Sequence, residues 1–564
     1  MKKKWSENSE EQTTFTAKSI DRKARGNVEM WKMWNPIAIG CENGRPFIAR
    51  PLSSNRERIP PDRTVPQLQT PNYKLQTTNY NMKKKSLIAM AAAILTVTLL
   101  HTNAQEKYQA TWESLKKYQT PEWFRDAKFG IFIHWGVYSV PAFGSEWYPR
   151  EMYQKGSKEF QHHITKYGPQ SKFGYKDFIP LFKAEKFDAV QWVDLFKKAG
   201  AKYVVPVAEH HDGFQMYKSA LSRWNAFEMG PHRDVLGELA TEIRKQGLIF
   251  GLSSHRIEHW FFMNGGRRFE SDILDPTNAD LYGPAREENE TPSAEYMNDW
   301  LLRNTELVNN YQPQLFWFDW WIEQPAMDPY RKSFASFYYN KGLEWNKGVV
   351  VNYKNVSFPD GTAVLDLERG KLAGIRKLPW QTDDAIGNQS WGYAEGNTFK
   401  NAQYVITNLI DIVSKNGNLL LNIGPRADGT ITEEETETLL GTGKWLTING
   451  EAIYGTRPWI IFGEGPTESA SGSFSDQKKP FTAQDIRFTT KGAVLYAIVM
   501  GKPMGNTIIK SLGTKTAHGT VSSIEVLGTN EKITWTQQAD ALVIKSLKNY
   551  PSDNAVSFKI NFKN

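Results

Sequence analysis

The chain has 564 residues, of which 40% are hydrophobic, 13% aromatic and 23% charged. These fractions describe a globular protein and exclude a disordered, collagen-like or disulfide-scaffold chain, and the length predicts two domains. The formal net charge of +8 comes from the N-terminal segment. Residues 1–104 carry 17 basic and 8 acidic residues, whereas residues 105–564 carry 52 basic and 53 acidic ones. The main part of the chain therefore gives no indication of a nucleic-acid partner.

Residues 82–104 have the order of segments that is typical of a secretory signal peptide. Three lysines follow Met82, an apolar run extends over 87–100, and small residues end the segment at Ala104. The alternative is a membrane anchor, but about 14 apolar residues are fewer than the roughly 20 that a spanning helix needs. We therefore expect an exported, periplasmic or secreted protein that is cleaved near Ala104 and has no membrane attachment in its mature form.

Residues 1–81 are rich in arginine and lysine, lack apolar periodicity, and are predicted to be an over-extended start rather than a domain. They contain Cys41, the only cysteine of the chain. The mature chain, residues 105–564, would then have no thiol for disulfides or metal binding.

From Phe129 to Pro425, short β-branched and aromatic runs alternate with amphipathic helical segments. The strand candidates are Phe129–Gly136, Tyr203–His210, Leu248–His255, Gln314–Trp321, Gly348–Tyr353, Ala363–Glu368, Pro379–Asp384 and Asn418–Pro425. Helices are predicted over Asp188–Gly200, with Asp188 as N-cap and Gly200 just past the end, and over Asp234–Gly247, Ala294–Asn310 and Lys400–Gly417. This α/β pattern predicts a (β/α)8 TIM-like barrel within a domain of residues 105–458. A doubly wound open sheet is the alternative, although no glycine-rich phosphate loop follows a strand.

After Pro458 the pattern changes to short strands separated by turns that contain glycine and asparagine. The strand candidates are Asp485–Thr490, Ala493–Val499, Ser523–Leu527 and Ala555–Asn561. They predict a C-terminal antiparallel β-sandwich over residues 459–564. We interpret it as a packing and stability module, with carbohydrate binding as the alternative.

Polar residues gather where the predicted barrel strands end, which is the face that carries chemistry in barrels of this kind. They are His134, Glu146, Trp147, His210, His211, His255, Asp319, Lys354 and Glu368. Carboxylates, histidines and tryptophans on one face are typical of a sugar site, because tryptophan stacks on a sugar ring while polar groups bind its hydroxyls. The mature chain has 17 tryptophans, many of them at predicted strand ends, and Trp317, Trp320 and Trp321 flank Asp319.

Asp319 ends an otherwise apolar strand, where a carboxylate is costly unless it is used or paired. A salt bridge to a barrel lysine is the structural alternative. The run Glu209-His210-His211-Asp212 permits a metal hydrolase as another interpretation. However, neighbouring strand residues point to opposite sides, and no His-x-His or His-Glu-x-x-His spacing occurs, so we predict no metal and no cofactor.

Six motifs stand out along the chain. They are Phe129-Gly-Ile-Phe-Ile-His134-Trp-Gly, Glu146-Trp147-Tyr148, His210-His211-Asp212-Gly213-Phe214, Arg233-Asp234, Trp317-Phe-Asp319 and Asn422-Ile-Gly-Pro-Arg-Ala-Asp-Gly. Together they resemble the retaining α-L-fucosidases of glycoside hydrolase family 29. The resemblance extends over the whole mature chain, including residues 482–488 of the predicted sandwich.

The resemblance implies that Asp319 is the nucleophile. It implies hydroxyl contacts from His134, Glu146, Trp147, His210 and His211, and an apolar wall from Phe132, Trp317 and Trp391. The chain differs from the family at two positions of the predicted site. Lys354 stands where the family has an arginine, which a lysine does not replace as a bidentate donor, and His255 lies in a region where the family has a tyrosine.

We place the acid/base at Glu368, because the family's acid/base follows the segment that matches Lys354. Asp366 competes because it shares a strand face with Glu368, and Glu323, Asp383 and Asp384 are further candidates. An ion pair of Glu368 with Arg369 or Lys371 is the structural alternative.

The expected activity is release of terminal fucose from fucosylated oligosaccharides or glycoconjugates, with retention and without a cofactor. A glycosidase for a related L-sugar, such as an α-L-galactoside, and a non-catalytic sugar-binding protein are the alternatives.

Overall fold

The computed structural model describes residues 106–468, 471–475, 479–516 and 519–563. The predicted signal peptide at 82–104 and residues 1–81 lie outside the described residues. In the described part of the chain, no helix combines the length and the apolar character that crossing a bilayer requires.

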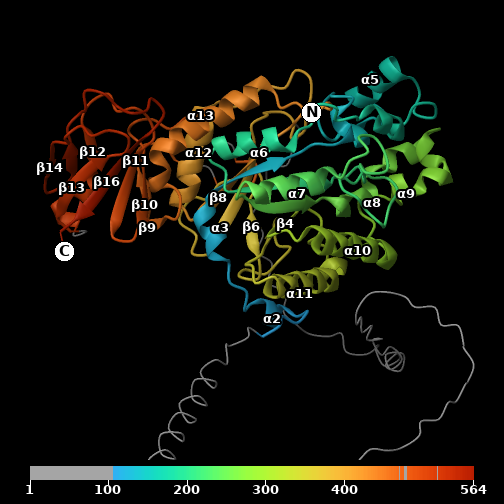
Figure 1. The fold of residues 1–564 in the computed structure, drawn as a ribbon, viewed down its shortest axis with the longest axis horizontal. Coiled ribbons are helices and arrows are strands. Elements are labelled where there is room, and N and C mark those ends of the chain that lie inside the picture. The colour runs from blue at the N-terminus through green and yellow to red at the C-terminus, as the bar shows by residue number, and fades with distance from the viewer. Residues whose placement is uncertain (1–105, 469–470, 476–478, 517–518, 564) are drawn as a thin grey trace, which may run out of the picture. The chain divides into compact units, whose positions relative to one another are not determined.

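Eight parallel strands close into a barrel in chain order, and β8 pairs with β1 (Figure 1). They are β1 (Phe129–Ile133), β2 (Tyr203–Glu209), β3 (Ile249–Ser254), β4 (Leu315–Phe318), β5 (Val350–Tyr353), β6 (Val364–Asp366), β7 (Trp380–Ala385) and β8 (Gly417–Ile423). Every predicted barrel strand overlaps one of them. The predicted TIM-like barrel is therefore confirmed, and the open doubly wound sheet is wrong.

Helices surround this barrel. They are α2 (Trp112–Leu115), α3 (Glu122–Ala127), α4 (Tyr148–Glu151), α5 (Lys158–Tyr167), α6 (Ala189–Lys198), α7 (Val235–Lys245), α8 (His259–Phe262), α9 (Ala279–Tyr282), α10 (Ala294–Tyr311), α11 (Asp328–Glu344), α12 (Ala402–Ser414) and α13 (Glu433–Asn449). The ends of α6 follow the prediction: the Asp188 carboxylate accepts hydrogen bonds from the backbone N–H groups of Val190 and Gln191, and Gly200 adopts φ +92°.

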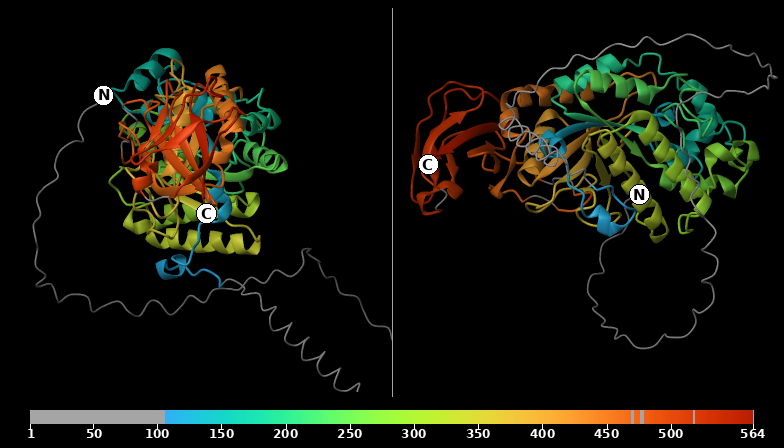
Figure 2. Two further views of the ribbon diagram at one scale, coloured as in Figure 1. Left: turned by 90° about the vertical axis from the view of Figure 1, so that its left-hand side faces the viewer. Right: turned by 60° about the horizontal axis from the view of Figure 1, so that its bottom comes forward.

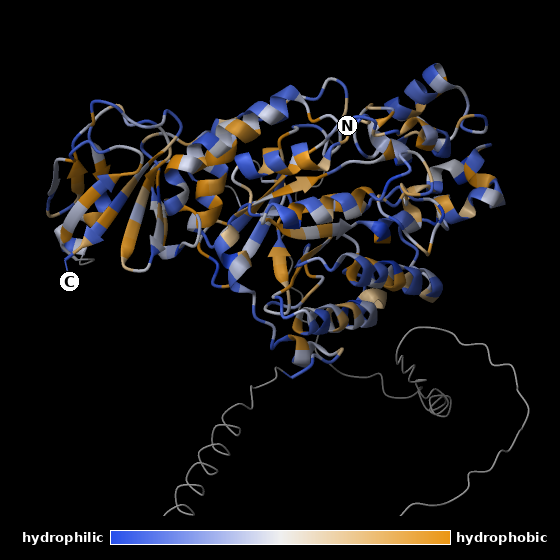
Figure 3. Cartoon of the chain, in the orientation of Figure 1, coloured by the Kyte–Doolittle hydropathy of each residue, from blue (hydrophilic) through white to orange (hydrophobic). Residues whose placement is uncertain are grey.

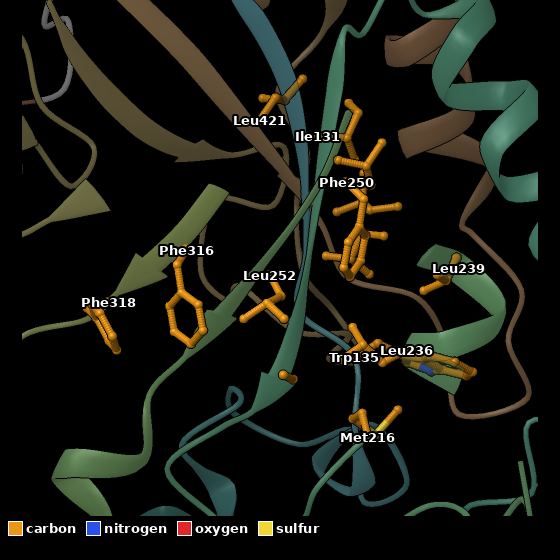
Figure 4. Packing of buried hydrophobic residues seen from close by; sticks show 14 of the residues in the cluster. Ile131, Trp135, Met216, Leu236, Leu239, Phe250, Leu252, Phe316, Phe318 and Leu421 are labelled. Carbon is orange, nitrogen blue, oxygen red and sulfur yellow. The ribbon is translucent and has the colours of Figure 1, made fainter. Parts of the chain in front are cut away.

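The strands are apolar on both faces because helices cover the outer face and side chains fill the interior. Figure 3 shows this as hydrophobic strands inside helices of mixed character. In Figure 4, Leu236 and Leu239 of α7 lie against the side of β3 that carries Phe250 and Leu252. Inside the barrel, Phe132 and Trp317 belong to a separate buried cluster, which also contains Phe124 of α3.

The alternation of strands and helices is incomplete. No α-helix lies between β5 and β6 or between β6 and β7, where the chain makes short connections instead. The connection after β6 pairs with a distant segment: the backbone of Lys371 exchanges hydrogen bonds with that of Gly472, at N–O distances of 3.2 and 2.9 Å. A segment from beyond the barrel thus lies beside the strand end that carries Glu368.

The C-terminal part forms two antiparallel sheets around its own apolar core (Figure 2). Their strands are β9 (Arg457–Glu464), β10 (Ile486–Lys491), β11 (Val494–Val499), β12 (Thr507–Ile509), β13 (Val521–Val526), β14 (Trp535–Gln537), β15 (Leu542–Ile544) and β16 (Val556–Phe562). One sheet has the order β13-β16-β11-β10-β9 and the other β12-β15-β14. The predicted antiparallel C-terminal domain is confirmed.

A buried ion cluster links this domain to α12. The Asp411 carboxylate accepts hydrogen bonds from Arg487 Nε at 2.7 Å and Lys415 Nζ at 2.8 Å. Burial opposes ionisation of Asp411, but the two cations outweigh it and lower its pKa to about 2. Because α12 directly precedes β8, this contact ties the C-terminal sheet to the barrel wall.

Candidate active site

A cavity of about 150 Å³ lies at the carboxyl ends of the barrel strands. It is lined by His134, Glu146, Trp147, His210, His211, His255, Glu258, Trp317, Asp319, Trp320, Glu368, Asp383, Trp391 and Phe474. The structure thus brings together all the site residues predicted from the sequence except Phe132 and Lys354. This volume is smaller than that of most pockets for drug-sized ligands and suits a single small ring.

Asp319 directly follows β4 and is held by two histidines. Its Oδ2 atom lies 2.8 Å from Nδ1 of His255 and 3.4 Å from Nε2 of His211, and Oδ1 accepts a hydrogen bond from the backbone N–H of Trp320 at 2.9 Å. Burial favours the neutral acid, but the hydrogen bonds from His211 and His255 outweigh it and hold the pKa of Asp319 well below its usual value. The carboxylate is therefore ionised and oriented, and the alternative of a lysine salt bridge is wrong.

His255 is a positioning residue: the sequence predicts its place at the end of the third strand but not its contact with Asp319. Its Nδ1 faces Asp319 while its Nε2 lies 2.9 Å from Oγ of Ser253, so both ring nitrogens have partners. Burial lowers the pKa of His255, although Asp319 opposes the shift. A neutral ring that donates from Nδ1 to Asp319 and accepts from Ser253 satisfies all these atoms.

Glu258 is a cavity residue that sequence analysis missed, and it lies just after β3 in a 3₁₀ turn over Arg256–Glu258. Its Oε2 atom is 3.8 Å from Nδ1 of His211. Burial disfavours the cation at His211, but Glu258 and Asp319 outweigh it and raise the pKa of His211 to about 9. Burial has the opposite effect on a carboxyl group and raises the pKa of Glu258 to about 8, against the opposing effect of His211. His211 thus faces Asp319 through Nε2, and the attraction of Asp319 favours the protonated ring, which supports the negative charge of the carboxylate.

Glu368 lies two residues past the end of β6. Its Oε2 atom accepts a hydrogen bond from Nε1 of Trp320 at 2.5 Å and lies 3.8 Å from Nζ of Lys354. Burial raises the pKa of Glu368 against the opposing effect of Lys354, and the charge of Asp319 adds to the increase. The side chain of Arg369, which was an alternative partner for Glu368, donates to the carbonyl oxygens of Gly387 and Asn388.

Lys354 lies below the cavity and does not line it, which corrects its predicted role as a sugar contact. Its side chain is fully buried, and Nζ lies 2.9 Å from Asp366 and 2.5 Å from Asp383. Burial disfavours the charged amine, but the attraction of Asp366 and Asp383 outweighs burial and raises the pKa of Lys354. Lys354 acts on the site through charge rather than through contact with a ligand.

The other acid/base candidates are less well placed than Glu368. Asp366 is fully buried against Lys354, and Asp384 pairs with Lys400 at 2.6 Å. Neither of these, nor Glu323, is among the cavity-lining residues. Asp383 does line the cavity, but burial and Asp366 raise its pKa well above the usual value, and its Oδ1 is occupied by Lys354.

His134 and His210 offer neutral ring nitrogens to a ligand. Asn422 orients His134: its amide N–H donates to the carbonyl of Trp391, so its oxygen accepts from Nδ1 of His134 at 2.7 Å. Burial lowers the pKa of both histidines well below the usual value. Among the described residues, none forms a hydrogen bond with the buried Nδ1 of His210 or with Nε1 of Trp317. A ligand with hydroxyl groups would satisfy such atoms.

The apolar side of the cavity is built in two layers. Phe132 is fully buried and packs edge-on against Trp317, with ring centroids 5.0 Å apart, so it supports the wall from below rather than lining it. Trp391 forms part of the wall itself. Glu146 fixes the loop of Trp391, because its Oε2 accepts from Ser390 Oγ at 2.9 Å and from the Trp391 N–H at 2.8 Å.

Two groups of side chains lie close enough together to hold a metal ion, with candidate ligand atoms within 4.8 Å of one another. They are His134, His210 and His255, and His211, His255 and Asp319. Both groups need His255, whose two ring nitrogens already face Asp319 and Ser253. A metal ion would have to displace these contacts, so the donor set does not fit a resident metal.

Comparison with known proteins confirms the resemblance that the motifs predict. Residues 95–451 match the family described as alpha-L-fucosidase, and residues 477–561 match the alpha-L-fucosidase C-terminal domain. The tissue alpha-L-fucosidase of Homo sapiens is 35% identical over 458 residues, which cover 79% of this chain and 89% of that protein. That of Mus musculus is 34% identical over 461 residues, with coverage of 79% and 92%.

Solved structures agree with the sequence comparison. The Thermotoga maritima alpha-fucosidase, alone and in complex with fucose, is 31% identical with a TM-score of 0.65, and the alignment covers 80% of this chain and 100% of that one. Since the family match spans the barrel domain and more than half of the chain, and these relatives align over nearly their full length, the chain belongs to the alpha-L-fucosidase family, glycoside hydrolase family 29.

Proposed function

We propose that the protein is a retaining exo-α-L-fucosidase that releases terminal fucose from oligosaccharides or glycoconjugates. The observation that carries the proposal is that Asp319 and Glu368 line one cavity while their surroundings shift their pKa values in opposite directions. When two carboxyl groups have pKa values that are separated in this way, one can act as an ionised nucleophile and the other as a protonated acid. Family membership and the fucose complex of the Thermotoga maritima relative support the choice of sugar.

In the first step, an Asp319 oxygen forms a bond to the anomeric carbon while the bond from that carbon to the leaving oxygen breaks. Glu368 gives its proton to the leaving oxygen, so the rest of the glycan departs as an alcohol. The product is a fucosyl ester of Asp319 with inverted configuration. His255 and His211 orient the Asp319 carboxylate toward this attack.

In the second step, Glu368 is a carboxylate and takes a proton from water. The water oxygen attacks the anomeric carbon from the side that the leaving group vacated, and the ester bond to Asp319 breaks. Fucose leaves with net retention, and Glu368 is again protonated.

The nucleophile assignment predicts the behaviour of Asp319→Ala. The wild-type protein should cleave a nitrophenyl α-L-fucoside in preference to the α-L-galactoside, and the variant should lose about 10⁴-fold or more in turnover. Azide should restore part of the activity and yield β-fucosyl azide, because it attacks the face that Asp319 no longer occupies. Product analysis by NMR measures this.

The matched control is Asp553→Ala, which alters an exposed side chain in the C-terminal domain that pairs with Lys502. It should retain wild-type turnover. Near-wild-type turnover in Asp319→Ala would contradict the assignment, and wild-type cleavage of another glycoside but not of the fucoside would contradict the proposed sugar.

The acid/base assignment predicts a dependence on the leaving group. Glu368→Gln should lower the turnover of a natural fucosyl disaccharide by about 10²-fold to 10⁴-fold, and that of an activated aryl fucoside far less, because only the poor leaving group needs a proton. Azide should attack the anomeric carbon of the fucosyl ester, so that the bond to Asp319 breaks and α-fucosyl azide is released. Equal losses on both substrates, with the selective loss found in Asp366→Asn or Glu323→Gln, would move the role to that residue.

The hydrogen bond from Trp320 to Glu368 predicts a change in the pH profile. This N–H stabilises the carboxylate and lowers the pKa of Glu368, so Trp320→Phe should raise that pKa. Because Glu368 works first as an acid, the basic limb of kcat/KM should move to higher pH. Trp321→Phe, one residue away and outside the cavity lining, is the control and should leave the limb in place. A limb that stays or moves to lower pH in Trp320→Phe would contradict the coupling.

We further propose that the protein is exported, on the basis of the signal-like segment at 82–104. The natural mature protein should begin close to Gln105, which N-terminal sequencing measures. Recovery of residues 1–81 on the protein isolated from its native cells would count against export by this signal.

A further inference from the structure

Two aromatic side chains from distant parts of the chain meet at the edge of the cavity. Trp320 follows Asp319 at the end of β4, and Phe474 comes from the connection between β9 and β10 in the C-terminal domain. Their rings are nearly parallel, with an interplanar angle of 13° and centroids 6.3 Å apart. Both line the cavity, and Phe474 keeps 62% of its surface exposed.

The backbone around Phe474 is attached to the loop that carries Glu368. The N–H of Phe474 donates to the carbonyl oxygen of Glu368 at 2.8 Å, and Gly472 pairs with Lys371 just beyond it. Ser475 closes the turn, since its Oγ donates to the carbonyl of Gly472 at 2.5 Å. A direct backbone hydrogen bond thus fixes the position of Phe474 relative to Glu368.

The backbone conformation and the exposure of Phe474 are both unusual for a phenylalanine. Its φ of +54° lies in the left-handed region, which bulky residues rarely adopt, and its ring remains in contact with solvent. A residue that is strained and exposed at the rim of a site is a candidate for ligand contact. The core of the C-terminal domain does not include it.

The position of Glu368 shows which part of a substrate would meet these rings. A general acid lies within hydrogen-bond reach of the leaving oxygen, so the departing group begins at the Glu368 carboxyl. Trp320 contacts that carboxyl through Nε1, and Phe474 contacts the same residue through its backbone. The fucose ring, by contrast, must reach Asp319 and the histidines on the inner side.

We propose that Trp320 and Phe474 form a subsite for the leaving group, where the apolar face of the pyranose attached to fucose stacks on the aromatic rings. This inference rests on the proposed function and names its substrate class: fucose linked to a second sugar ring. The C-terminal domain then contributes directly to the binding of substrate.

The test compares two substrates that share fucose and differ in the leaving group. One is α-L-fucosyl fluoride, whose leaving group has no surface to stack, and the other is a set of α-L-fucosyl disaccharides with hexopyranose leaving groups. In Phe474→Ala, the ratio of kcat/KM for the best disaccharide to that for the fluoride should fall about tenfold, the upper range for one aromatic stack. Phe474→Tyr keeps the ring and should restore the ratio.

The matched control is Met504→Ala, because Met504 is 93% exposed in the same domain and lies outside the cavity lining. It should keep the wild-type ratio. An unchanged ratio in Phe474→Ala, or wild-type hydrolysis of the fluoride but of none of the disaccharides, would overturn the subsite while leaving the proposed function intact. Wild-type protein that does not hydrolyse the fluoride would overturn the proposed function itself, and the subsite with it.

Discussion

The buried amine of Lys354 lies within 4 Å of three carboxyl groups, those of Asp366, Asp383 and Glu368, and one positive charge cannot neutralise three negative ones. In a buried environment the surplus negative charge is relieved by protonation. Burial and carboxylate neighbours accordingly raise the pKa values of Asp383 and Glu368. Asp319 meets two histidines instead and remains ionised. The division of labour between acid and nucleophile follows from this distribution of charge.

The closed barrel makes this distribution possible because it brings the carboxyl ends of all its strands to one face. Asp319 and Glu368 come from strands that are not hydrogen-bonded to each other, yet they share one cavity. The missing helix after β6 has a further consequence. It leaves the backbone near Lys371 available to pair with Gly472, which connects the C-terminal domain to the loop of the proposed acid.

Sequence analysis predicted the barrel well because buried parallel strands are continuous apolar runs and the helices carry clear end signals, as at Asp188 and Gly200. It also found most of the cavity, since polar residues at strand ends stand out against those runs. It misplaced Lys354, because burial among carboxylates depends on three strands at once. It missed Glu258 and Phe474, whose positions depend on a short turn and on a long-range backbone contact with no local pattern.

The central claim is that Asp319 forms a covalent bond to the sugar. Incubation with 2-deoxy-2-fluoro-α-L-fucosyl fluoride tests it most directly, because the fluorine at C2 slows hydrolysis of the ester while fluoride remains a good leaving group. Digestion and mass spectrometry should find the fluorofucosyl group on the Asp319 side chain. Labelling of a different residue, or inactivation without a covalent label, would contradict the account.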